Sequence, residues 1–121
     1  MSKILIIDDE EPILNMYGEA LRGQHEVIFA NNGETGLETA QKEHPDLILL
    51  DIIMPKFNGL DVLERLRSNN DTADIPVLML TNLPQEASGD KAKQLGAKGY
   101  FVKAEYEPDK LAKVVQELIN G

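Results

Sequence analysis

The sequence predicts a doubly wound α/β sandwich, in which a five-stranded parallel sheet carries helices on both faces. Five short aliphatic runs recur along the chain, and the segments between them have helical periodicity. Polar residues do not alternate with apolar ones inside these runs. Such continuous apolar runs are typical of strands that are buried on both faces of a parallel sheet covered by helices. The predicted strands are residues 4–7, 27–30, 47–50, 77–80 and 100–102.

Four of the five segments that join or follow these strands are amphipathic. The clearest is 108–119, which Pro108 opens and whose apolar residues recur at helical spacing on one face. The segment 85–95 is the weakest, because it has few apolar residues and contains Gly89, which costs about 1 kcal/mol relative to alanine in a helix. We expect a short or mobile helix there. The other predicted helices are 12–22, 33–43, with Asn31 or Asn32 as its cap, and 59–68.

The β-α unit therefore repeats five times, with right-handed crossovers between parallel strands. The expected strand order is 2-1-3-4-5, a flavodoxin-like three-layer arrangement. The polar segment 68–74 is expected to be a loop, and residues 1–121 are expected to form one domain.

Composition excludes several functions. The 21 acidic and 12 basic residues give a formal net charge of −9, which disfavours direct binding of nucleic acid or anionic membrane. The chain has no cysteine, so disulfides and thiolate metal sites are excluded. Its longest apolar runs are far too short to span a bilayer, and acidic residues at 8–11 do not fit a signal peptide. We expect a cytoplasmic protein.

Polar residues directly follow four of the predicted strands. Asp8 and Asp9 follow the first, Asp51 the third, Thr81 the fourth and Lys103 the fifth. Each one alone reads as a helix cap, a turn residue, a loop hydroxyl or a solvated charge. Together they converge on the carboxyl edge of the sheet, where ligands bind in doubly wound folds. This convergence predicts a functional site.

The chemistry of this set indicates phosphoryl transfer. Three carboxylates repel one another unless a cation joins them, and oxygen ligands with few protein donors suit Mg²⁺. The lysine and the threonine hydroxyl would complete a pocket for a tetrahedral oxyanion. A carboxylate there can act as a nucleophile, and Asp51 is the central candidate because its strand lies beside the switch in strand order.

Four motifs in order resemble those of a response-regulator receiver domain of two-component signalling, similar to the single-domain chemotaxis regulators. The resemblance covers the whole chain. The motifs are residues 4–10, residues 49–55 with Gly59, residues 76–81 and residues 96–103.

The resemblance implies a role for each site residue. Asp51 would accept a phosphoryl group from a histidine kinase, a phosphotransfer protein or a small donor such as acetyl phosphate. Asp9, Asp51 and the backbone carbonyl of Ile53 would bind Mg²⁺ directly, and Asp8 would act mostly through a bound water. Such a domain promotes its own phosphorylation and dephosphorylation but is not a turnover enzyme.

The same resemblance implies a switch. Lys103 would pair with the acyl phosphate, Thr81 would move to hydrogen-bond it, and Tyr100 would turn inward when Thr81 moves. A half-buried strand aromatic is the simpler interpretation of Tyr100. The face built from residues 85–119 would then present a changed surface to an output protein, and output would run through protein contacts.

Four residues depart from the usual family pattern. Ala104 stands where a proline with a cis peptide bond is usual, so the loop is either trans and rearranged or held cis under strain. Asn82 stands where a small residue is common and is expected to narrow access to the site. Ile53 and Leu83 are apolar at the two variable positions that tune hydrolysis. We expect both to keep water from attacking, which predicts a long-lived acyl phosphate.

The main alternative is a phosphorylation-independent binding module of the same fold. An aspartate-nucleophile phosphatase is disfavoured because Ile53 replaces its usual second aspartate, and a flavin-binding domain because the acidic residues at 8–11 would repel a phosphate. Among residues outside the site, we expect Met16 and Met79 in the core and His25 and His44 on the surface.

Overall fold

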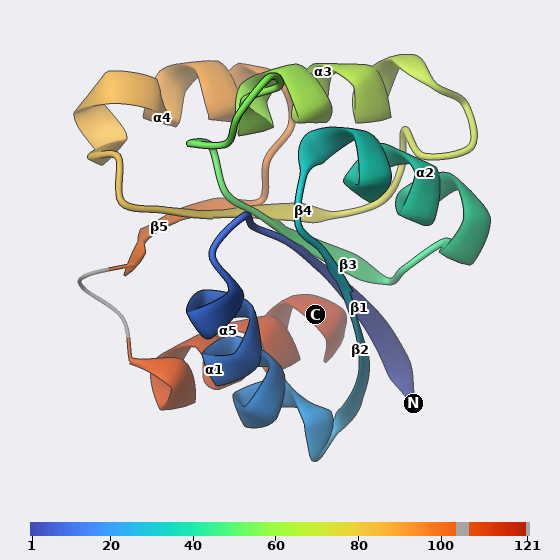
Figure 1. Cartoon of the computed structure of the whole chain (residues 1–121), viewed down its shortest axis with the longest axis vertical. Coiled ribbons are helices and arrows are strands. Elements are labelled where there is room, and N and C mark those ends of the chain that lie inside the picture. Colours follow the sequence, from blue (N-terminus) through green and yellow to red (C-terminus); the bar gives the residue numbers. More distant parts are fainter. Residues whose placement is uncertain (104–106, 121) are drawn as a thin grey trace.

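The structure is a computed structural model, and it describes residues 1–103 and 107–120. All ten predicted elements are present, each with bounds within two residues of the prediction (Figure 1). The strands are β1 (Ser2–Ile7), β2 (His25–Ala30), β3 (Leu47–Leu50), β4 (Val77–Thr81) and β5 (Gly99–Val102). The helices are α1 (Glu11–Arg22), α2 (Gly33–Glu43), α3 (Gly59–Ser68), α4 (Gln85–Gln94) and α5 (Pro108–Asn120).

The sheet confirms the predicted topology. Its strands lie in the order β2-β1-β3-β4-β5, and every neighbouring pair is parallel. Figure 1 shows α1 and α5 on one face of the sheet and α2, α3 and α4 on the other. The result is the three-layer, doubly wound, flavodoxin-like arrangement expected from the sequence.

Each face of the sheet has its own hydrophobic core. Leu5 and Ile7 of β1 pack in the cluster that includes residues of α2, α3 and α4, whereas Ile4 and Ile6 pack in the cluster that includes residues of α1 and α5. All four are at most 1% exposed, since successive residues of a strand point to opposite faces. Burial on both sides is why β1 reads as a continuous apolar run.

Side-chain caps and one arginine fix the connections. Asn32 accepts a hydrogen bond from the backbone N–H of Thr35 at 2.8 Å, so Asn32, not Asn31, caps α2. The Arg67 guanidinium of α3 donates to the carbonyls of Ile75 at 2.9 Å and Leu95 at 3.0 Å, tying the turns before β4 to the end of α4. The segment 68–74 is a loop after its first residue, as predicted.

Helix α4 is short, as expected, with ten residues. Its buried residues are Ser88 and Ala92, so little apolar surface fixes it to the sheet. The sequence left open whether the peptide bond between Lys103 and Ala104 is cis or trans. That bond lies outside the described residues.

Two predictions outside the site were wrong. His25 is buried at 4% exposure, because β2 begins two residues earlier than predicted and places His25 on the same face as Val27 and Phe29. Met16 is 41% exposed, because it lies off the buried stripe of α1. Met79 is buried and His44 exposed, as expected.

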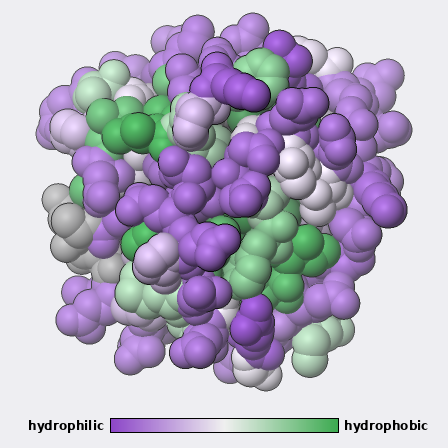
Figure 2. Space-filling model, in the orientation of Figure 1, coloured by the Kyte–Doolittle hydropathy of each residue, from purple (hydrophilic) through white to green (hydrophobic). Residues whose placement is uncertain are grey.

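The molecular surface is mainly hydrophilic. Figure 2 shows one face, on which hydrophobic residues form small separate patches among hydrophilic ones. The large hydrophobic residues that stand out as exposed are Met1, Met16 and Ile53. In the described part of the chain, no helix combines the length and apolar composition needed to cross a membrane.

Candidate functional site at the carboxyl edge of the sheet

The ends of β1 and β3 place two aspartates side by side. Ile7 pairs with Leu50 in the register of these strands, so Asp8 and Asp51 follow at the same level. The backbone N–H of Asp51 donates to the carbonyl of Ile7 at 3.0 Å. Both aspartates are buried, at 1% and 3% exposure. The predicted convergence of these residues is confirmed.

A glycine fixes the loop that follows Asp51. The N–H of Gly59 donates to the carbonyl of Ile52 at 2.8 Å, and a Cβ on Gly59 would lie 2.0 Å from the backbone oxygen of Asp51. Only a residue without a side chain lets α3 begin so close to this backbone. Gly59 therefore holds the start of α3 against the strand end that carries Asp51.

Lys103 lies between the two buried aspartates. Its Nζ is 2.5 Å from Asp8 Oδ2 and 3.1 Å from Asp51 Oδ2, and the side chain is 4% exposed. The other oxygen of Asp51, Oδ1, accepts a hydrogen bond from the N–H of Ile52 at 2.7 Å. One buried ammonium thus neutralises part of the charge of two buried carboxylates.

The electrostatics of the group reflect competition between burial and pairing. Burial raises the pKa of Asp8, and the hydrogen bonds from Lys103 and from the Glu10 N–H only partly offset it. Burial lowers the pKa of Lys103, but the charges and hydrogen bonds of Asp8 and Asp51 outweigh this and leave that pKa raised. Lys103 therefore stays an ammonium in this site.

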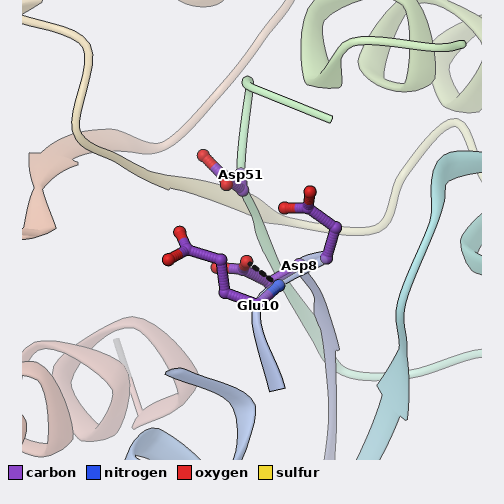
Figure 3. Close-up of side chains that lie close together, drawn as sticks. Asp8, Glu10 and Asp51 are labelled. Atoms are coloured by element: carbon purple, nitrogen blue, oxygen red, sulfur yellow. Dashed lines mark hydrogen bonds between the residues drawn. The ribbon is translucent and has the colours of Figure 1, made fainter. Parts of the chain in front are cut away.

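Four acidic residues could hold a cation together. Asp8, Asp9, Glu10 and Asp51 each place one carboxylate oxygen within 4.8 Å of the others. Figure 3 shows Asp8 and Glu10 at the end of β1 and Asp51 at the end of β3, with their side chains close together. Four carboxylates against one ammonium leave a net negative charge, and all-oxygen ligands suit a hard divalent ion. These residues fit Mg²⁺.

Glu10 was not among the predicted site residues. Its only signal in the sequence was its position directly after Asp9, and the residue before a helix is usually a cap. That the carbonyl of Ile53 binds the metal ion stays a prediction. The backbone nitrogen of Ile53 lies 3.4 Å from Asp51 Oδ1, so this residue is close to the site.

A small pocket of about 230 Å³ opens onto Asp51. Asn82 lines this pocket and is exposed, and Ile53 is 56% exposed there; that Asn82 narrows access stays a prediction. Leu83 instead packs against the core under α2, α3 and α4. The pocket is lined by Asp9, Glu10, Asp51, Ile53, Asn82 and Lys103.

Thr81 and Tyr100 meet at the same loop. The Thr81 side chain, at the end of β4, is buried, and its Oγ1 accepts a hydrogen bond from the N–H of Leu83 at 3.4 Å. The half-buried Tyr100 of β5 donates its hydroxyl to the carbonyls of Leu83 at 3.0 Å and Pro84 at 3.4 Å. The loop from β4 to α4 thus connects the two predicted switch residues.

The fold and this acidic, lysine-bearing strand edge define a class of signalling domain. The family model described as response regulator receiver domain matches residues 4–116, so the chain belongs to the response-regulator receiver family. Receiver domains take phosphoryl groups from histidine kinases, act on output partners, typically bind Mg²⁺ and are generally not turnover enzymes.

Particular relatives agree with this assignment. Protein PilH of Pseudomonas aeruginosa is 34% identical and matches over the full length of both chains. The alkaline phosphatase synthesis transcriptional regulatory protein PhoP of Bacillus subtilis is 40% identical over 84% of this chain, which spans only 42% of PhoP. The crystallised chemotaxis protein CheY4 of Vibrio cholerae has a TM-score of 0.90 and 32% identity, covering 98% of both chains.

Proposed function

We propose that this receiver domain is a cytoplasmic phosphorylation switch in which Asp51 accepts the phosphoryl group. The observation that carries the proposal is the contact of Asp51 Oδ2 with the buried Lys103 ammonium at 3.1 Å, beside three further carboxylates that fit Mg²⁺. The donor is the phosphohistidine of a histidine kinase or of a phosphotransfer protein. The protein is not a turnover enzyme, because its product is its own modified side chain.

The transfer is a displacement at phosphorus. The bond from an Asp51 oxygen to phosphorus forms as the phosphorus–nitrogen bond of phosphohistidine breaks, and the released imidazole takes a proton from solvent. With acetyl phosphate, a phosphorus–oxygen bond breaks and acetate leaves. Asp9, Asp51 and the Ile53 carbonyl would hold Mg²⁺, with Asp8 acting through a water, and the bound ion would offset the negative charge on the transferring oxygens.

Phosphorylation changes the ion pairs of Lys103. Its ammonium pairs with Asp8 and Asp51 before transfer. Once Asp51 carries the phosphoryl group, the ammonium pairs with the phosphoryl oxygens, which lie beyond the former carboxylate. Burial at 4% exposure strengthens this charge-assisted contact relative to one in open water.

Thr81 and Tyr100 carry the change outward. A Thr81 hydroxyl that moves to bond the phosphoryl group gives up its contact with the N–H of Leu83. The hydroxyl of Tyr100 bonds the carbonyl of the same residue, so a rearranged loop frees Tyr100 to turn inward. The face from residues 85–119 then changes shape for an output protein. Its partners are proteins and not nucleic acid, in keeping with the net charge of −9.

One experiment tests the proposal. The protein is incubated with Mg²⁺ and acetyl phosphate or beryllofluoride, and its mass and spectra are compared with those of Asp51→Asn. Asp71→Asn, an exposed aspartate in the loop after α3, is the matched control. We expect a change that requires both Mg²⁺ and Asp51 and that the control retains. No change with any donor would support the phosphorylation-independent binding module instead.

A further inference from the structure

Glu10 follows Asp8 and Asp9 in the chain and lines the pocket that opens onto Asp51. Its Oε1 lies 3.4 Å from the Lys103 ammonium, and its side chain lines the pocket over Asp51. The Glu10 side chain is 56% exposed, whereas those of Lys103, Asp8 and Asp51 are at most 4% exposed. Among the three carboxylates that contact Lys103, that of Glu10 is thus the one exposed to solvent.

The side chain of Glu10 is not used for helix capping. Glu10 is the N-cap residue of α1, yet its side chain makes no cap hydrogen bond. Only its backbone serves the helix, since its carbonyl accepts from the N–H groups of Ile13 and Leu14. The backbone N–H of Glu10 is held by Asp8 Oδ1 at 2.9 Å. This bond fixes where the side chain starts and leaves the carboxylate at the pocket.

We propose that Glu10 determines selectivity between phosphoryl donors, by placing a fixed negative charge on the donor's approach to Asp51 and by competing for Lys103. This inference rests on the proposed phosphorylation of Asp51. A small donor such as acetyl phosphate carries two negative charges and must enter beside the Glu10 carboxylate. Its phosphoryl oxygens also need the Lys103 ammonium, which Glu10 already contacts.

The size of the effect follows from the distances. Glu10 and Asp51 place carboxylate oxygens within 4.8 Å of each other, so a phosphoryl group at Asp51 lies at a similar distance from the Glu10 charge. The repulsion between a single charge and a dianion at roughly 5 Å in water, reduced by physiological salt, corresponds to a rate effect of about three- to tenfold. Removing the charge therefore accelerates phosphorylation by a small dianion.

The test compares Glu10→Gln with Glu11→Gln at saturating Mg²⁺. Both remove one carboxylate from adjacent exposed residues at nearly constant shape, but Glu11 does not line the pocket. We expect Glu10→Gln to raise the rate of phosphorylation by acetyl phosphate about three- to tenfold. The gain is smaller with phosphoramidate, which carries less net negative charge, and it shrinks as salt is added. Glu11→Gln stays near the wild-type rate.

The outcomes separate this inference from the proposed function. Equal rates for the wild type and Glu10→Gln, or equal gains for both variants, overturn the role of Glu10 while leaving Asp51 as the acceptor. A Mg²⁺ titration followed by fluorescence or calorimetry gives the second readout. If Glu10→Gln only weakens Mg²⁺ binding and leaves the saturated rate unchanged, Glu10 is a metal-site residue and the inference is wrong. If no donor phosphorylates the wild-type protein, the proposed function itself is wrong.

Discussion

Replacing Gly59 by alanine tests how the loop holds Asp51. The new Cβ would lie 2.0 Å from the Asp51 backbone oxygen and 2.8 Å from the Ile52 Cα, whereas real Cβ atoms stay beyond 3.0 Å. The gap to Asp51 must therefore open by at least 3.0 − 2.0 = 1.0 Å. Alanine gains about 1 kcal/mol over glycine inside a helix, but overpacking costs about 1–3 kcal/mol and more where backbone must move.

The clash is with backbone and not with a flexible side chain, so we expect the upper end of the overpacking cost and a net loss of about 2 kcal/mol in the free energy of unfolding. Urea denaturation with Mg²⁺ removed measures it, and phosphorylation of the folded fraction reports the displaced Asp51. Gly23→Ala is the control, since nothing lies within 4 Å of its Cβ and its φ is −63°. It should gain about 0.4–1 kcal/mol. Wild-type stability and phosphorylation in Gly59→Ala would refute the reasoning.

Three further substitutions test other parts of the site. Lys103→Met leaves Asp8 and Asp51 without their buried cation, so it should lose about 3–5 kcal/mol without metal and gain more from added Mg²⁺ than the wild type does in thermal unfolding; an equal Mg²⁺ response in both proteins contradicts this. Ile53→Asn places a polar group at the pocket and should shorten the lifetime of the acyl phosphate, measured by loss of the phosphorylated mass after donor removal; an unchanged lifetime argues against water exclusion by Ile53. Tyr100→Phe removes the hydroxyl that bonds the β4–α4 loop and should cost about 0.5–1.5 kcal/mol in urea denaturation, and a neutral result shows that this bond does not stabilise the loop.

Much of the fold and the site could be predicted from local patterns. The apolar run at residues 47–50 became β3 with the same bounds, because a strand buried on both faces must be apolar throughout. Asp51 and Lys103 were found because parallel strands bring their carboxyl ends to one edge. His25 was misplaced because one polar residue at a strand start carries no local signal of burial. Met16 was misplaced because its apolar side chain suggested burial, although it lies off the buried stripe of α1.

The sequence by itself determined which elements form, their order, and the set of residues at the strand ends, since these depend on periodicity and on neighbours along the chain. Only the tertiary structure decided the contacts between distant residues. Lys103 lies between Asp8 and Asp51, Gly59 packs on the Asp51 backbone, and Glu10 turns its carboxylate into the pocket. Such contacts join residues from separate strands and loops, and their distances follow from how the helices and the sheet pack, which no local pattern specifies.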